Sequence, residues 1–185
     1  MQTERNRKLG CSCCGPGAGG IDRRRFLQFS AAALAALTPF TARADDRPID
    51  ALLLLCSDRR IWQPSINFMN AREMQRVYRS FAIEGGAIGL IAEQFRNTPL
   101  RRKFWEDLDS AVTWNGVQKI IALDHRDCDA AVTAYGLAKI SDRLLETEMH
   151  RYALNEFRSR VAARHADVDV EIGLMALDGK VQMFR

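Results

Sequence analysis

The sequence predicts an α/β fold with a mainly parallel central sheet of about four strands, flanked by helices, and a short antiparallel edge strand. Two apolar runs without alternation, Ala51–Leu55 and Lys119–Leu123, are typical of strands buried on both faces of a parallel sheet. Segments with helical character lie between the strand candidates, and this alternation favours a parallel sheet. Asp178-Gly179 forms a tight-turn signal, so Val181–Phe184 is expected to return as the short edge strand.

The remaining strands are predicted from weaker patterns. Residues 168–177 (VDVEIGLMAL) alternate in their first half and then reach the turn. Phe81–Ile83 is a weaker strand candidate, closed by Gly85-Gly86. No internal repeat or low-complexity tract interrupts the pattern, and one domain is expected.

Helix starts and stops are visible in the sequence. Thr98-Pro99 supplies an N-cap followed by proline at the first helical position, and that helix is expected to stop at Asn115-Gly116. Ser141-Asp142 is expected to start a second, longer helix. This helix would carry one apolar stripe formed by Leu145, Met149 and Tyr152. Residues 67–79 and 128–138 are also predicted to be helical.

Residues 1–44 are predicted to be a cleaved twin-arginine signal peptide, which leaves residues 45–185 as the folded domain. Residues 23–27 (RRRFL) resemble the twin-arginine export signal, an Ala-rich apolar stretch follows, and Ala42-Arg43-Ala44 matches a signal-peptidase site. An uncleaved membrane anchor is the alternative, which the short apolar run disfavours. We therefore expect the twin-arginine export machinery to deliver the protein to the periplasm.

An upstream CSCCG segment contains Cys11, Cys13 and Cys14. A metal clip or a redox site is one interpretation of this segment. The other is an unstructured leader segment that is lost on maturation, and we favour it.

Charge is distributed unevenly along the chain. The formal net charge is +4, but seven of the 27 Lys and Arg residues and only two of the 23 Asp and Glu residues lie within residues 1–44. The basic character therefore belongs to the leader, and the domain is close to neutral. We expect no nucleic-acid partner.

Two of the five cysteines, Cys56 and Cys128, fall in the domain, each at or just beyond the carboxyl end of a predicted strand. Ligand sites gather at that edge of a parallel sheet. His125 lies three residues before Cys128, so one turn of backbone can direct both side chains to one point. Two thiolates, an imidazole and one carboxylate or water complete a tetrahedral zinc site. A disulfide is the alternative in an oxidising compartment, but it leaves His125 unexplained.

Cys56 also opens the segment C-S-D-R-R. On an extended backbone, Cys56, Asp58 and Arg60 would point to the same side, because side chains alternate with a period of two. A surface ion pair is the simpler interpretation of Asp58 and Arg60 when they are taken alone. Next to a metal ligand, we predict that they belong to the site.

C-S-D-R-R (residues 56–60) and H-R-D-C (residues 125–128) resemble the C-x-D-x-R and H-x-x-C motifs of β-class carbonic anhydrases. The segments LDSAVTWNGVQKIIALDHRDCDAA and VEIGLMALDGKVQMF are similar to the helix, strand and metal loop and to the closing hairpin of that family. The resemblance covers most of residues 50–185. It implies that Cys56, His125 and Cys128 ligate Zn²⁺. Asp58 would either take the fourth position or pair with Arg60 and leave that position to water.

The resemblance further implies reversible hydration of carbon dioxide to bicarbonate by zinc-bound hydroxide. Asp58 would orient the hydroxide, and Arg60 would keep Asp58 ionised and away from the metal. A homodimer is a possible assembly, although the helical arm that embraces the partner subunit in the family is nearly absent here. His150 and His165 are expected on a solvated helix face and receive no role.

Two departures from the family pattern concern the pocket. Residues 82–87 (AIEGGA) replace the family's R-N-A-G-N segment, and Asp129 replaces the glycine after the second cysteine. Together with Glu84 and Asp127, Asp129 would make the rim acidic. One alternative function is hydrolysis of carbonyl sulfide or carbon disulfide, and another is a non-catalytic, zinc-stabilised binding protein with Asp58 on the metal. An apolar channel to the fourth site would be lined by Ile61, Ile83 and Ile88.

Overall fold

The structure is a computed structural model that describes residues 49–75 and 77–185. The signal-peptide prediction and the three cysteines of the CSCCG segment lie outside the described residues. In the part that the structure describes, no helix is long and apolar enough to cross a membrane.

The centre of the fold is a five-stranded sheet with the order β2-β1-β3-β4-β5. The first four strands run parallel to their neighbours, and β5 is antiparallel to β4. The predicted fold class is therefore confirmed, including the short antiparallel strand at one edge. The strands are β1 (Ala51–Cys56), β2 (Tyr78–Ile83), β3 (Lys119–His125), β4 (Asp169–Met175) and β5 (Val181–Phe184).

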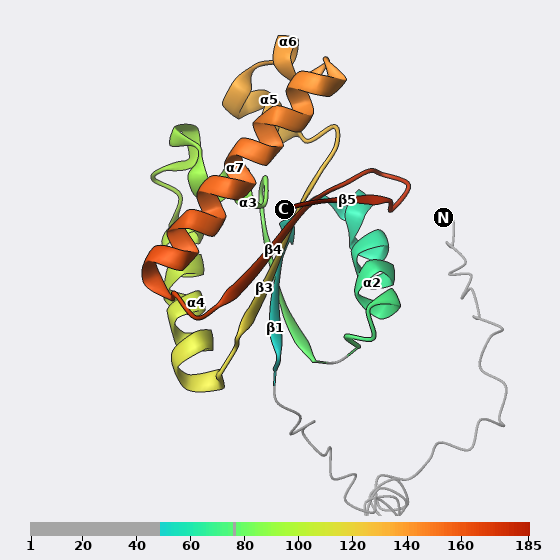
Figure 1. Cartoon of the computed structure of the whole chain (residues 1–185). Helices are drawn as coiled ribbons and strands as arrows, with labels where there is room; N and C mark the ends of the chain where they lie inside the picture. Colours follow the sequence, from blue (N-terminus) through green and yellow to red (C-terminus); the bar gives the residue numbers. More distant parts are fainter. Residues whose placement is uncertain (1–48, 76) are drawn as a thin grey trace, which may run out of the picture. The chain divides into compact units, whose positions relative to one another are not determined.

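Helices cover both faces of the sheet, with α4 and α7 on one side and α2 on the other (Figure 1). The alternation of β1 explains this arrangement. Leu52 and Leu54 belong to one core cluster with residues of α4 and α7, whereas Leu53 and Leu55 belong to a second cluster with Met69 of α2. The helical elements are η1 (Arg59–Ile61), α2 (Trp62–Ala71), α3 (Ala87–Ile91), η2 (Glu93–Phe95), α4 (Pro99–Asn115), α5 (Asp129–Tyr135), α6 (Leu137–Ile140) and α7 (Arg143–Arg164).

The two helices with clear terminal signals form as predicted. Pro99 opens α4, and Gly116 ends it in the left-handed conformation with φ of 68°. Asp142 caps α7 by accepting hydrogen bonds from the backbone N–H groups of Leu144 and Leu145. The predicted helix at 128–138 is two short helices, α5 and α6, which are separated at Gly136 with φ of 88°.

Two predictions about helices were wrong. The helix expected at 67–79 lies earlier, because α2 ends at Ala71 and residues from Tyr78 onward pair with β1 as strand β2. Pairing with a buried central strand outweighs the local helical pattern. Of the apolar stripe predicted on α7, Leu145 and Tyr152 are exposed and Met149 is half-buried against the second core cluster. The first turns of α7 bury Glu146, Thr147 and His150 instead. Their hydrogen-bond partners explain the burial: Glu146 and Thr147 bond Arg126 and Asp127 in the loop after β3, and His150 contacts Asp124 within β3.

Candidate metal centre

The three predicted metal ligands meet at the carboxyl edge of the sheet. Cys56 is the last residue of β1, His125 is the last residue of β3, and Cys128 lies directly before α5. All three are buried, and their ligand atoms lie within 4.8 Å of one another. We refer to these three residues as the Cys-His-Cys cluster.

The free atoms of the cluster fit a metal ion. His125 Nδ1 lies 2.8 Å from the carbonyl oxygen of Arg126, which places the proton on Nδ1 and leaves a lone pair on Nε2. Nε2 is buried and has no hydrogen-bond partner among the described residues. Cys56 and Cys128 are free thiols, so the disulfide alternative is not the arrangement found. Thiolate sulfur and imidazole nitrogen are the atoms that bind zinc, and separations within 4.8 Å let one ion lie among all three.

The charge within the cluster is concentrated on Cys56. A hydrogen bond from the Cys128 thiol outweighs burial and, together with the adjacent His125 imidazole, lowers the pKa of Cys56 to about 4. The pKa of Cys128 is raised, because its proton is held by Cys56 and because it is buried. Burial lowers the pKa of His125, but its contact with Cys56 and the charge of Cys56 outweigh this effect and raise it. Cys56 is therefore the more acidic of the two thiols.

Asp58 and Arg60 form a two-point ion pair next to the cluster. Asp58 Oδ2 accepts hydrogen bonds from Arg60 Nε at 2.8 Å and Nη2 at 2.5 Å, and Oδ1 accepts one from the Arg60 backbone N–H at 2.8 Å. These bonds, together with the charge of Arg60, lower the pKa of Asp58 to about 2. Asp58 Oδ2 lies 4.0 Å from His125 Nε2, so an ionised carboxylate stands beside the position of a metal.

The pairing does not arise from an extended backbone, as the period-two argument assumed. Asp58 is extended, but it caps the 3-10 turn η1, which contains Arg60. The turn brings the guanidinium back to the carboxylate that caps it. Arg60 Nη2 also donates to the carbonyl oxygen of Asp127 at 2.9 Å, so Arg60 joins the loop after β1 to the loop after β3.

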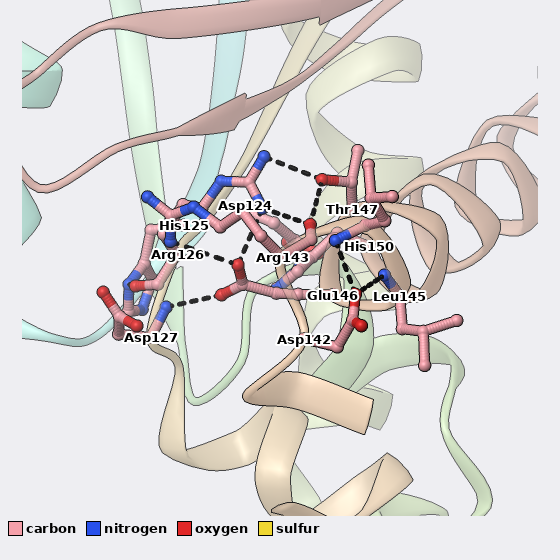
Figure 2. Close-up of polar contacts among 11 residues, drawn as sticks. Asp124, His125, Arg126, Asp127, Asp142, Arg143, Leu145, Glu146, Thr147 and His150 are labelled. Carbon is pink, nitrogen blue, oxygen red and sulfur yellow. Dashed lines mark hydrogen bonds and ion pairs between the residues drawn. The ribbon is translucent and has the colours of Figure 1, made fainter. Parts of the chain in front are cut away.

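A buried carboxylate on α7 anchors the loop that carries His125 and Cys128 (Figure 2). Glu146 accepts from Arg126 Nη1 at 2.7 Å and from the backbone N–H of Asp127 at 2.8 Å. Arg126 also donates to Thr147 Oγ1 at 2.7 Å. Asp127 has a φ of 56°, a left-handed conformation that an aspartate tolerates and that these bonds hold in place. Glu146 carries no signal in the sequence, because its position one residue after Leu145 puts it off the predicted apolar stripe.

Replacing Glu146 by glutamine is expected to destabilise the fold by about 3–5 kcal/mol, the usual effect of breaking a buried ion pair. Burial opposes ionisation of Glu146, but the Arg126 hydrogen bond outweighs it and lowers the pKa of Glu146. A lowered folded-state pKa stabilises the fold above the unfolded value of about 4.3 and loses this effect as pH falls through the folded pKa.

Urea unfolding of wild type and Glu146→Gln at pH 7 and at pH 3–4 measures this effect. The difference in unfolding free energy should shrink in acid. Glu148→Gln is the matched control, because Glu148 lies on the same helix in an exposed pair with Arg151, and about 0.5 kcal/mol or less is expected there. Equal effects at positions 146 and 148 would contradict the anchoring role.

A cavity of about 460 Å³ opens onto the cluster and has a polar wall. Ile61, Ile83 and Ile88, which were expected to line an apolar channel, are instead buried in the two cores. The expectation of an acidic rim holds for Glu84 and Asp129. Ten residues line the cavity: Cys56, Ser57, Asp58, Arg59, Arg60, Glu84, His125, Cys128, Asp129 and Ala130.

The expectation of solvated histidines was wrong for His150. Its side chain is fully buried, and Nδ1 lies 3.0 Å from Oδ2 of Asp124, the residue before the metal ligand His125. His165 lies at the opposite end of α7, where Nε2 is 2.8 Å from Asp109. No local signal in the sequence separates the two histidines, because both follow a helical pattern and differ only in what packs against them.

Solved structures of β-carbonic anhydrases share this fold. The carbonic anhydrase of Streptococcus mutans is 16% identical with a TM-score of 0.51, over 88% of this chain and 97% of that one. Coccomyxa β-carbonic anhydrase, in complex with acetazolamide, is 14% identical with a TM-score of 0.51, over 90% and 87%. The chain therefore has the β-carbonic anhydrase fold, and the fold carries a Cys-His-Cys cluster that could hold a metal.

Comparison of sequences adds relatives without an assigned activity. No family model matches the chain. Uncharacterised proteins of Rickettsia bellii and Rickettsia conorii are each 24% identical over 131 residues. These matches cover 71% of this chain, and 79% and 69% of the two relatives.

Proposed function

We propose that the protein is a zinc enzyme that catalyses the reversible hydration of carbon dioxide to bicarbonate. The observation that carries this proposal is the unpartnered Nε2 of His125 facing two free thiols beside an ionised carboxylate, on a β-carbonic anhydrase fold. Two thiolates and one imidazole form a ligand set that suits zinc. When bound, zinc acts as a Lewis acid that makes water acidic enough to supply a nucleophile near neutral pH.

The protein's own residues would position the reacting groups. Asp58 is ionised and lies in the cavity, where it can accept a hydrogen bond from the hydroxyl group of the reacting water. Arg60 engages both carboxylate oxygens and so keeps Asp58 in this place. The alternative of a non-catalytic protein requires Asp58 as a fourth ligand, and the bonds to Arg60 disfavour it. Arg59 at the cavity wall could attract the bicarbonate anion.

Metal analysis and a stopped-flow hydration assay on the purified chain test the proposal. We expect about one zinc per chain, as for a single four-ligand site, and hydration activity that chelation removes and zinc restores. Carbonyl sulfide and carbon disulfide are assayed in parallel. A zinc-loaded protein that hydrolyses either of these and does not hydrate carbon dioxide would replace the proposed substrate, and inactivity on all three would favour a binding function.

Export and assembly stay predictions from the sequence. We propose that the leader directs the protein to the periplasm through the twin-arginine pathway and is removed after Ala44. The N-terminal sequence of protein recovered from the periplasm checks both points. A homodimer is checked by the molar mass of the purified protein in solution.

A further inference from the structure

A buried Asp124–His150 pair lies directly behind the metal cluster. Asp124 is 1% exposed and His150 is fully buried. Asp124 Oδ2 contacts His150 Nδ1 at 3.0 Å, and Oδ1 accepts a hydrogen bond from the backbone N–H of Ala87 at 2.8 Å. The pair therefore ties β3 and α7 to the turn that precedes α3. Neither side chain lines the cavity, so contact with solvent or substrate there does not explain why this polar pair is present in the core.

The turn at residues 84–87 is shaped around Asp124. Gly86 has φ of 56° and ψ of −122°, and a Cβ at this position would lie 2.6 Å from Asp124 Oδ1. Only glycine accommodates both this backbone conformation and the close approach of the carboxylate. This is the segment that departs from the R-N-A-G-N sequence of the family that the chain resembles.

The same turn touches a sulfur of the cluster. The backbone N–H of Gly85 points to Cys56 Sγ at an N···S distance of 3.2 Å. A hydrogen bond to a thiolate withdraws electron density from sulfur and so changes its bonding to a metal. His150 contacts Asp124, and Asp124 accepts a hydrogen bond from the backbone of Ala87. The backbone of the turn then leads from Ala87 to Gly85, whose N–H reaches the sulfur of Cys56.

We propose that His150 is a positioning residue of the metal centre: with Asp124 it fixes the turn at 84–87, so that Gly85 N–H donates to Cys56 Sγ and sets the metal affinity of that sulfur. This inference rests on the proposed function in requiring that the cluster binds a metal. Outer partners of this kind contribute about 10–100-fold to metal affinity.

The test compares substitutions of His150. His150→Leu removes the contact to Asp124 and places an apolar side chain of similar size in the core. His150→Asn places an amide N–H near the position of Nδ1 and serves as the conservative rescue. His150→Gln, whose amide lies one carbon farther out, replaces the leucine variant if that protein does not fold. Phe157→Leu is the matched control, because Phe157 is buried on the same helix and packs in the core that lies against α4.

Two readouts separate positioning from general stability: zinc affinity by chelator competition, and the thiolate-to-metal charge-transfer band of the cobalt-loaded protein. His150→Leu should lose about 10–100-fold in zinc affinity and shift the cobalt band. His150→Asn should stay within a few fold of wild type. Phe157→Leu should unfold more easily without changing the band.

The outcomes also separate this inference from the proposed reaction. Folded His150→Leu or His150→Gln with wild-type affinity and band would overturn the positioning role, as would equal changes in Phe157→Leu. Metal binding by wild type without carbon dioxide hydration would overturn the proposed reaction alone. A wild-type protein that binds neither zinc nor cobalt would overturn both.

Discussion

Cys56→Ser, His125→Ala and Cys128→Ser are each expected to remove the metal and all hydration activity. Zinc sites of this kind bind with about 10–16 kcal/mol, so losing one ligand costs at least about 3 kcal/mol, which is more than a hundredfold in affinity. Serine cannot replace a thiolate at neutral pH, and alanine leaves no imidazole. The zinc content of dialysed protein should fall from about one per chain to background.

Stability and pH give independent measures of the same site. A ligand at one hundred times its Kd stabilises the folded state by about 2.7 kcal/mol, so chelation should lower the unfolding free energy of wild type and leave the variants unchanged. The raised pKa of Cys128, which arises from its bond to Cys56 and from burial, means that this thiol must lose a proton when metal binds. Zinc affinity should therefore fall about tenfold for each released proton when the pH is lowered by one unit.

His165→Ala is the matched control for His125→Ala, because His165 pairs with Asp109 at the far end of α7. It should keep zinc and activity. Full zinc occupancy in Cys56→Ser, or a Cys56–Cys128 disulfide in metal-free wild type isolated from the periplasm, would show that the cluster is not a metal site.

Arg60→Ala is expected to keep its zinc and to lose carbon dioxide hydration by at least about 10²-fold in kcat/KM, or about 2.7 kcal/mol. Among the described residues, the hydrogen bonds to the Asp58 carboxylate all come from Arg60. The carboxylate also lies 4.0 Å from Nε2 of His125. Without the guanidinium, Oδ2 of Asp58 loses both of its hydrogen bonds and can move toward the metal and compete with water, while Oδ1 keeps its bond from the backbone N–H of residue 60. The loop after β3 also loses its bond from Arg60 Nη2 to Asp127.

Companion variants separate the carboxylate from the cation. Asp58→Ala should keep the metal and lose less activity, because the position stays open to water while its orienting acceptor is gone. Arg60→Lys should rescue only in part, since one ammonium cannot reproduce the planar two-point contact. Arg96→Ala is the matched control, because Arg96 pairs with Glu93 on the surface and does not line the cavity, and its kcat/KM should stay near that of wild type. Each variant is assayed with its zinc content measured, and full activity of zinc-loaded Arg60→Ala would show that Arg60 is not needed to hold Asp58 away from the metal.

The sequence by itself determined the fold class and the three candidate ligands. The apolar runs of β1 and β3 mark strands buried on both faces, and parallel strands place their carboxyl ends at one edge of the sheet. Cys56 and His125 end those strands, so their proximity follows from local patterns. The spacing of His125 and Cys128 on one short loop adds the third ligand. Likewise, the caps of α4 and α7 involve only neighbours in the chain.

Only the tertiary structure decided how the site is supported. Glu146 contacts Asp127 across 19 residues of sequence, and His150 contacts Asp124 across 26. The periodicity of a sequence indicates which positions are apolar. It does not indicate whether a polar side chain will have hydrogen-bond partners in the core. For that reason the predicted stripe of α7 does not include Glu146 and His150, which the helix buries together with Ala153, Leu154, Phe157 and Val161. The strand predicted at Phe81–Ile83 is part of β2, but the first two residues of β2, Tyr78 and Arg79, were mistaken for helix, since pairing with β1 is a long-range contact that outweighs local propensity.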